Sequence, residues 1–317
     1  MSNILSKLII VFALVFSAFS CGQPMQKTNN NTSGKKETKL VSIPGFNADS
    51  AYYYVEKQVS FGPRVAGTEA HQKCAQYLEE KLEEFCDTVF VQNFKARTYD
   101  NVTRNGINLI GSFKPAEKNR VLLMAHWDSR PFADHDADIS KRNTPIDGAN
   151  DGASGVGVLL EAARQFHKQN PEVGVDIVFF DLEDWGPPTD LNIYEEEYWG
   201  LGSQHWAKNP HVYGYDATFG ILLDMVGAYN PTFLKEYFSK YYARYYVDMV
   251  WDRAKMLGYD DVFINLDGGA VNDDHIFVNK YAKIPSIDII DLDAGSENGS
   301  FFEQWHTTGD NMEQIDK

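Results

Sequence analysis

The stretch Val175-Asp176-Ile177-Val178-Phe179-Phe180-Asp181-Leu182-Glu183-Asp184 decides the fold of this chain. Its run of β-branched and aromatic residues predicts a buried strand, and three acids follow within four positions. Carboxylates crowded at the end of a buried strand cost free energy unless a positive group neutralises them. A metal ion is the natural partner, and open α/β sheets place their sites at strand ends. We therefore expect a metalloenzyme in which one acid binds the metal and its neighbour acts as a base.

The rest of the chain alternates helices with strands. Helices are expected at residues 47–58, 68–85, 154–167 and 235–256, the second of them capped by Thr68. Strands are expected at residues 88–96, 105–113, 121–125, 176–181, 220–226 and 285–290. The first two strands alternate in polarity and form antiparallel neighbours, whereas the later ones are continuously apolar. The pattern predicts a three-layer α/β/α domain with a mixed, mostly parallel central sheet.

Composition narrows the class of function. The chain has 317 residues, is 43% hydrophobic and 23% charged, and carries a net charge of −16. Such acidity argues against binding to nucleic acid or to an anionic membrane surface. It fits small or cationic substrates. The long polar segment at residues 185–198 is expected to be a functional loop.

The N-terminus has the pattern of an export signal. An apolar run at residues 8–19, too short to span a membrane, ends at Ser20-Cys21-Gly22. The expected organisation is a signal peptide over 1–20, a lipid-anchored disordered tether over 21–42 and one catalytic domain over 43–317. Lipidation at Cys21 would make the protein a monomeric periplasmic or outer-membrane lipoprotein of a Gram-negative bacterium, bound to the membrane only through its anchor. The alternative is an ordinary secretory signal with an incidental cysteine.

The two remaining cysteines are expected to be structural. Cys74 shares a helical face with apolar residues, so it is more readily a small core residue than a ligand. Cys86 lies where the same helix should end, which makes a disulfide between the two awkward.

Acids and histidines follow the other predicted strands in the same way. His126 and Asp128 follow the central strand, and Asp151 lies in a glycine-rich turn before a helix. Asp224 ends another apolar strand. Further on come Asn272-Asp273-Asp274-His275 and Gln304-Trp305-His306-Thr307. Each has a structural alternative: Asp151 as a helix cap, His275 as a core histidine, or His306 as a surface residue. Together they favour one site at the edge of one sheet.

These motifs, in this order, resemble the zinc aminopeptidase clan. Within it the chain is most similar to the glutaminyl cyclases (glutaminyl-peptide cyclotransferases) of the bacterial, single-zinc type, over residues 61–311. Asp273-Asp274-His275 and Trp305-His306-Thr307 stand where clan peptidases carry Ser-Asp-His and Tyr-His-Thr. Glu183-Asp184 replaces the Glu-Glu of the animal cyclases. The family usually continues past the Trp-His-Thr motif into a C-terminal helix, whereas this chain stops at Lys317, so we expect either a truncated sequence or a surface that is covered differently.

The resemblance implies roles for individual residues. Asp151, Asp184 and His306 match the ligands of a single zinc ion, and Glu183 matches the general acid/base. Asp224 and Asp273 match a pair of acids beside it, expected to share one proton. The remaining matches are pocket walls at Trp305, Phe301 and either Trp185 or Trp199, and supporting residues at His126, Asp128 and Asp274. Asp288 stands where the animal enzymes have a histidine.

The implied reaction is cyclisation of N-terminal glutamine in peptides and proteins to pyroglutamate, with release of ammonia. Zinc would polarise the γ-carboxamide, and Glu183 would move a proton from the attacking α-amine to the departing ammonia. The main rival is a di-zinc aminopeptidase with a second metal at His126, Asp151 and Asp224. A third possibility is a non-catalytic peptide-binding lipoprotein, which predicts a missing ligand or base.

Overall fold

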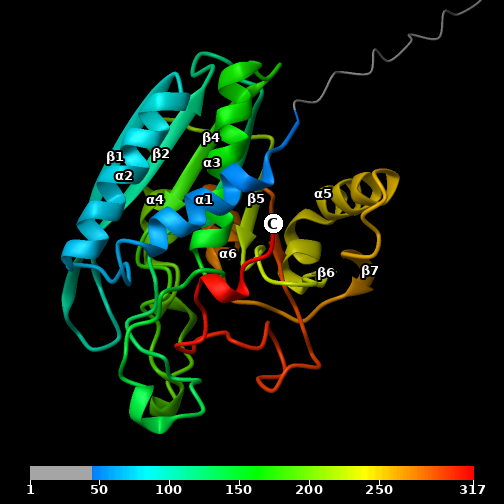
Figure 1. Ribbon diagram of the computed structural model, residues 1–317. Coiled ribbons are helices and arrows are strands. Elements are labelled where there is room, and N and C mark those ends of the chain that lie inside the picture. The colour runs from blue at the N-terminus through cyan, green and yellow to red at the C-terminus, as the bar shows by residue number, and fades with distance from the viewer. Residues whose placement is uncertain (1–44) are drawn as a thin grey trace, which may run out of the picture. The chain divides into compact units, whose positions relative to one another are not determined.

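A six-stranded sheet in the order β1-β2-β4-β3-β5-β8 forms the centre of the molecule (Figure 1). The computed structural model describes residues 45–317, so the predicted signal peptide, Cys21 and the whole of the predicted tether lie outside the described residues. The strands of this sheet are β1 Thr88–Arg97, β2 Thr103–Phe113, β3 Arg120–His126, β4 Gly174–Phe180, β5 Phe219–Asp224 and β8 Ser286–Ile290. β1 and β2 are antiparallel to each other, and β2 is antiparallel to β4, while β3, β4, β5 and β8 run parallel.

Helices cover both faces of the sheet, which confirms the predicted three-layer architecture. The helices are α1 Ala48–Val59, α2 Glu69–Phe85, α3 Ala153–Lys168, α4 Leu201–Lys208, α5 Tyr237–Met256 and α6 Asp274–Phe277. Side chains alternate along β4, so that Ile177 and Phe179 pack under α2 and α3, while Val178 and Phe180 face Trp206 of α4. Both faces of β4 are therefore buried, as its continuous apolar run predicts.

The far end of the sheet differs from the prediction. Helix α5 begins at Tyr237, because Glu236 caps it by accepting from the backbone N–H groups of Phe238 and Ser239. The residues before it form a short strand, β6 Phe233–Lys235, which pairs with β7 Phe263–Asp267 in a separate sheet. Figure 1 shows α5, β6 and β7 gathered at the end of the molecule opposite β1 and β2. The predicted helix over 235–256 thus starts two residues too early.

Two smaller features bear on the predictions. Cys74 is buried and Cys86 is the C-cap of α2, and both are free thiols. Among residues 45–317, no helix has the length and apolar character that a membrane span requires.

Candidate metal centre and active site

The carboxyl ends of the parallel strands bring the predicted site residues together. His126 ends β3, Glu183 and Asp184 follow β4, and Asp224 ends β5. Asp151 enters from the loop before α3, and His306 from the irregular C-terminal segment. All of these side chains are buried or nearly so, with Glu183 the most exposed at 8%. The sheet edge expected from the sequence is the edge where they meet.

Two groups of possible ligands share Asp151. The first, here called the Asp184 triad, consists of Asp151, Asp184 and His306. Nε2 of His306 lies 3.5 Å from an oxygen of Asp151 and 3.3 Å from Oδ1 of Asp184. The second, the Asp224 triad, consists of His126, Asp151 and Asp224, with Nε2 of His126 3.1 Å from an oxygen of each acid.

The Asp184 triad fits a zinc ion. Nitrogen and oxygen ligands about 2.0–2.2 Å from a tetrahedral zinc lie about 3.3–3.5 Å from one another, which matches the separations around His306 Nε2. Oδ2 of Asp184 is buried without a hydrogen-bond partner, a costly state that a cation would relieve. Two carboxylates and one imidazole would leave the bound zinc formally neutral, with a fourth position for a substrate oxygen.

A buried arginine supports this triad from behind. Nη1 of Arg130 lies 2.9 Å from Oδ1 of Asp184, and the rest of its guanidinium pairs with both oxygens of Asp134. Burial raises the pKa of Asp184, but the charges of His306 and Arg130 overcome that effect and hold it below its usual value. Nδ1 of His306 lies 3.6 Å from Asp134, too far for a hydrogen bond, so the acid acts on the imidazole through its charge.

Backbone constraints place the two acids after β4. Asp128 accepts hydrogen bonds from the backbone N–H groups of Glu183 and Asp184, at 3.1 and 3.3 Å. Leu182 adopts φ of +57°, which is unfavourable for a leucine and turns the chain sharply before Glu183. His306 has φ of +55°. Such strain persists only where the surroundings enforce it, and here it aims neighbouring side chains in different directions.

The loop that carries Asp151 is held as firmly. Asp310 accepts from the backbone N–H groups of Asn150 and Asp151, and Arg64 donates to the carbonyl oxygens of Asp147 and Gly148. Gly152 has φ of +91°, and a Cβ there would lie 2.8 Å from the carbonyl oxygen of Asp128. The glycine-rich turn is therefore needed for close packing against the end of β3.

The Asp224 triad carries its own internal compensation. Burial opposes a charged imidazole, yet hydrogen bonds with Asp128, Asp151 and Asp224 raise the pKa of His126 well above its usual value. The distances of 3.1 Å from His126 Nε2 to both acids are those of hydrogen bonds. A protonated His126 would offset part of the charge of these carboxylates without a second metal.

Glu183 directly precedes the ligand Asp184, and its buried carboxylate has the electrostatics of an acid/base group. Burial raises its pKa well above the usual value; the charge of His126 lowers it, and those of Asp273 and Asp184 raise it further. A raised pKa makes the carboxyl group a better proton acceptor, as a general acid/base requires.

The predicted partner of Asp273 has a competitor in the structure. Asp224 hydrogen-bonds to His126, while Asp288 of β8 has a carboxylate oxygen within 4.8 Å of one of Asp273. Burial raises the pKa of Asp273 to about 6, with the charge of Asp224 next in importance. Burial also raises the pKa of Asp288 well above its usual value, as do the charges of Asp273 and Asp224. Asp288 is therefore a second candidate, beside Asp224, to share a proton with Asp273, and both of its oxygens are buried without a hydrogen-bond partner. Asp273 is also the N-cap of α6, and its side chain accepts a hydrogen bond from the backbone N–H of Asp274. Burial raises the pKa of Asp274 as well.

An apolar cavity of about 500 Å³ opens beside the Asp184 triad. Trp199, Phe301 and Trp305 line it, and the ring of Trp305 lies 3.8 Å from that of His306. Trp185, predicted as a wall, does not line this cavity. It packs against Val65, Phe94, Leu182 and Leu201, with the guanidinium of Arg104 3.6 Å from its ring centre. The chain turns away after Asp184, so Trp199 supplies the wall instead.

The sequence reasoning missed the residues that support the ligands. Arg130, Asp134, Arg64 and Asp310 were assigned no role. One signal for Arg130 was available, because a lone cation two residues after Asp128 would compensate the acids at the same sheet edge.

Comparisons with known proteins agree with this geometry. A model described as peptidase family M28 matches residues 108–317. Glutaminyl-peptide cyclotransferase from Bos taurus is 28% identical over 255 residues, which cover 68% of this chain and 62% of that protein. The chain therefore spans less than two thirds of the length of this curated relative.

Solved structures are more similar. A glutaminyl cyclase from Tannerella forsythia is 53% identical, with a TM-score of 0.84 over 86% of this chain and 94% of that one. A Zn-dependent exopeptidase from Parabacteroides distasonis is also 53% identical, with a TM-score of 0.85 over 87% of this chain and 94% of that one. The zinc-aminopeptidase-like fold expected from the motifs is confirmed. The two structures carry names for different reactions.

Proposed function

The chain belongs to peptidase family M28, and from that membership we propose that it is a zinc-dependent glutaminyl-peptide cyclotransferase. It would convert the N-terminal glutamine of peptides and proteins to pyroglutamate and release ammonia. The observation that carries the proposal is the Asp184 triad, a group spaced for zinc that lies directly next to Glu183 in the chain and whose His306 stacks on Trp305, a wall of the aromatic cavity. Similarity to the Tannerella forsythia glutaminyl cyclase supports it.

One zinc ion per chain is part of the proposal. Asp151, Asp184 and His306 would hold it, and when bound it would supply Lewis-acid polarisation of the glutamine γ-carboxamide. Arg130 and Asp134 keep the ligands in place, which in other metal sites is worth about ten- to a hundredfold in affinity or activity.

Glu183 moves the proton that the reaction must transfer. The substrate α-amine nitrogen forms a bond to the carbonyl carbon of its own side chain, and the bond from that carbon to the amide nitrogen breaks. Glu183 accepts a proton from the attacking nitrogen and donates it to the departing one, which leaves as ammonia. No water molecule is consumed, so an active site that excludes water favours this outcome over hydrolysis.

Two further features suit cyclisation. A proton shared between Asp273 and Asp288 can be donated in a hydrogen bond while the other oxygens accept, so the pair can hold the amide group as it leaves. Trp199, Phe301 and Trp305 surround the glutamine side chain with apolar surface. Both features bind the substrate and neither activates a nucleophilic water.

The second candidate function is a di-zinc aminopeptidase. The ligand atoms of the Asp224 triad lie within 4.8 Å of one another, so this group has the residue types for a second metal. The name of the Parabacteroides distasonis structure favours the same reading. A non-catalytic peptide-binding role is disfavoured, because all three ligands of the Asp184 triad and Glu183 are present.

The experiment is a release assay on purified protein. A peptide that begins with glutamine should release ammonia with no free amino acid. The same peptide with an acetylated α-amine should release none, because its nucleophile is blocked. Free glutamine would indicate an aminopeptidase, and ammonia from the acetylated peptide would indicate a simple side-chain amidase. Either result would overturn the proposal.

Export, lipidation at Cys21 and a monomeric state are proposed on the sequence pattern alone. Labelling of expressing cells with a radioactive fatty acid tests the anchor. Label in the wild type and none in Cys21→Ser is expected. Equal label in both would contradict lipidation at this residue.

A further inference from the structure

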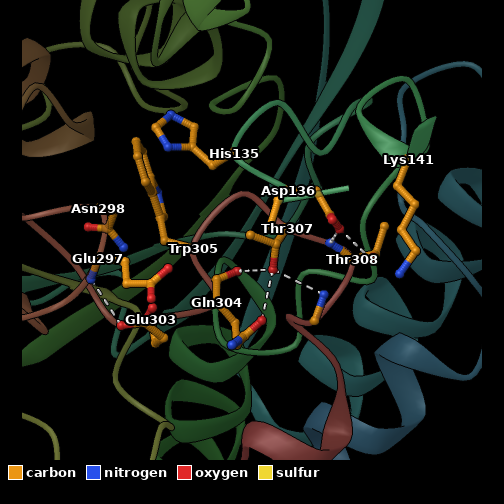
Figure 2. Close-up of a pocket in the computed structure, with 12 residues that line it drawn as sticks. His135, Asp136, Lys141, Glu297, Asn298, Glu303, Gln304, Trp305, Thr307 and Thr308 are labelled. Atoms are coloured by element: carbon orange, nitrogen blue, oxygen red, sulfur yellow. Dashed lines mark hydrogen bonds between the residues drawn. The ribbon is translucent and has the colours of Figure 1, made fainter. Parts of the chain in front are cut away.

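A second cavity, of about 510 Å³, is also lined by Trp305 (Figure 2). We call it the Trp305 groove. Its other lining residues include His135, Lys141, Glu297, Glu303 and Thr308. Trp305 lines both this groove and the aromatic cavity beside the metal centre. The place proposed for the glutamine side chain and this further open space therefore share the indole ring of Trp305 as a wall.

The groove is formed by two segments that are tied to each other. Asp136 accepts hydrogen bonds from the backbone N–H and the hydroxyl of Thr308, at 3.1 and 2.6 Å. The backbone N–H of His135 donates to the carbonyl oxygen of His306, and the His135 ring lies 4.4 Å from that of Trp305. These contacts fix the groove walls relative to a metal-centre histidine, so the groove is present before a ligand arrives.

Charge in the groove is unevenly placed. Figure 2 shows Glu297 and Glu303 on the Trp305 side and Lys141 at the other end. Within residues 45–317, no Lys or Arg forms an ion pair with either glutamate. Glu303 accepts from the backbone N–H of Glu297, which draws the two residues together.

We propose that the Trp305 groove binds the peptide residues that follow the N-terminal glutamine, and that Glu297 and Glu303 make it select cationic side chains there. This rests on the proposed function, which places the glutamine side chain against Trp305. An extended chain advances about 3.3–3.6 Å per residue, so the second and third residues of the peptide reach past a single indole ring. The preferred substrates are peptides with Lys or Arg at one of these positions.

The test is a comparison of kcat/KM for ammonia release from three otherwise identical peptides that begin Gln-Gly. The third residue is Lys, Gly or Glu. At low ionic strength the Lys peptide should exceed the Glu peptide by about three- to tenfold, as expected for two exposed carboxylates. The ratio should fall towards one at about 0.5 M salt, where exposed charges are screened. A parallel series with the charge at the second residue identifies the position.

Variants assign the effect to the groove. In E297Q/E303Q, which keeps the shape and the acceptor oxygens, the Lys-to-Glu ratio should fall to about one. K141Q should raise the ratio, because it removes the one cation that lines the groove. The matched control is E80Q/E83Q on α2, which removes the same charge from an exposed surface outside the groove and should leave the ratio unchanged.

The outcomes separate this inference from the proposed function. No ammonia from any of the three peptides would overturn the function itself. Ammonia from all three at equal rates, an unchanged ratio in E297Q/E303Q, or an equal fall in E80Q/E83Q would each overturn the role of the groove and leave the cyclisation in place.

Discussion

The Asp184 triad and the Asp224 triad share Asp151 and have the same composition, two aspartates and one histidine, yet they are built for different partners. In the Asp184 triad the donor atoms stand 3.3 and 3.5 Å apart, and Oδ2 of Asp184 has no hydrogen bond. In the Asp224 triad both separations are 3.1 Å, and the imidazole bridges the two acids. The first is spaced for a metal ion, and the second is satisfied by a proton on His126.

The surroundings explain the difference. Arg130 lies next to the Asp184 triad and pairs with Asp184, but its positive charge is balanced by Asp134. The carboxylates of the triad therefore keep a net negative charge that a metal cation can neutralise. The Asp224 triad has Asp128 on its far side and the Asp273–Asp288 pair nearby, all acids whose pKa values burial raises. The excess negative charge around the Asp224 triad favours protonation of its groups. The comparison teaches that ligand composition alone does not decide metal number, because the charge behind each ligand also counts.

The largest effect is expected at His306. His306→Ala removes one of three ligands, so zinc content should fall well below one per chain and activity by about a thousandfold or more. His126→Asn, the matching change in the other triad, should leave about one zinc per chain. Metal analysis of the two purified variants checks this. Loss of zinc from His126→Asn alone would reverse the assignment of the triads.

Glu183→Gln should reduce kcat by about a hundred- to ten-thousandfold, because the amide cannot carry the proton. Zinc content should stay near one per chain, since Glu183 belongs to neither triad. Ammonia release and metal analysis on one preparation measure both. Near-normal turnover would show that another group carries the proton.

Asp134→Asn weakens the support of the Asp184 triad without altering a ligand. The neutral amide no longer acts on His306 through its charge and leaves Arg130 without its bidentate partner, so zinc affinity should fall about ten- to a hundredfold. Competition with a chelator measures the change. Unaltered affinity would mean that ligand geometry alone decides binding.

Asp288→Asn should change kcat by less than about threefold. Its carboxyl is buried beside Asp273 and is expected to be protonated, and an amide offers a similar donor and acceptor in the same space. A fall of a hundredfold would show that Asp288 must ionise. Asp273→Asn serves as the comparison, because it would convert the pair's acceptor into an amide and should be more harmful.

Asp291 tests whether burial acts in the same way outside the triads. Burial raises its pKa to about 6, so in the folded state it holds a proton that the unfolded chain loses near pH 4. Its contribution to stability is present below about pH 4 and is lost as the pH rises to about 6. In Asp291→Asn the free energy of unfolding should therefore fall by about 1 kcal/mol less over this pH range. Denaturant titrations at pH 4.5 and 7.5 measure it, and identical pH dependence in both proteins would contradict the shift.

Much of the fold could be predicted because β3 and β4 are continuous apolar runs, and such strands fit only in the centre of a parallel sheet that is covered on both faces. Strand β6 could not, since three residues before a helix carry no periodicity, and its pairing with β7 depends on contacts distant in the chain. In the site, the acids at strand ends were predictable from topology, and the ligand roles came only with the family resemblance. Trp185 misled because it follows Asp184 directly, whereas the turn there sends its ring to Arg104. The proximity of Asp288 to Asp273 could not be predicted, because the two residues belong to different elements that only the fold brings together.

The central claim is that this centre performs intramolecular cyclisation and not hydrolysis. The most direct measurement is the mass of a glutamine-initiated peptide after incubation with the zinc-loaded protein. The account predicts a peptide of unchanged length that has lost the mass of one ammonia. A peptide shorter by one residue, accompanied by free glutamine, would contradict it.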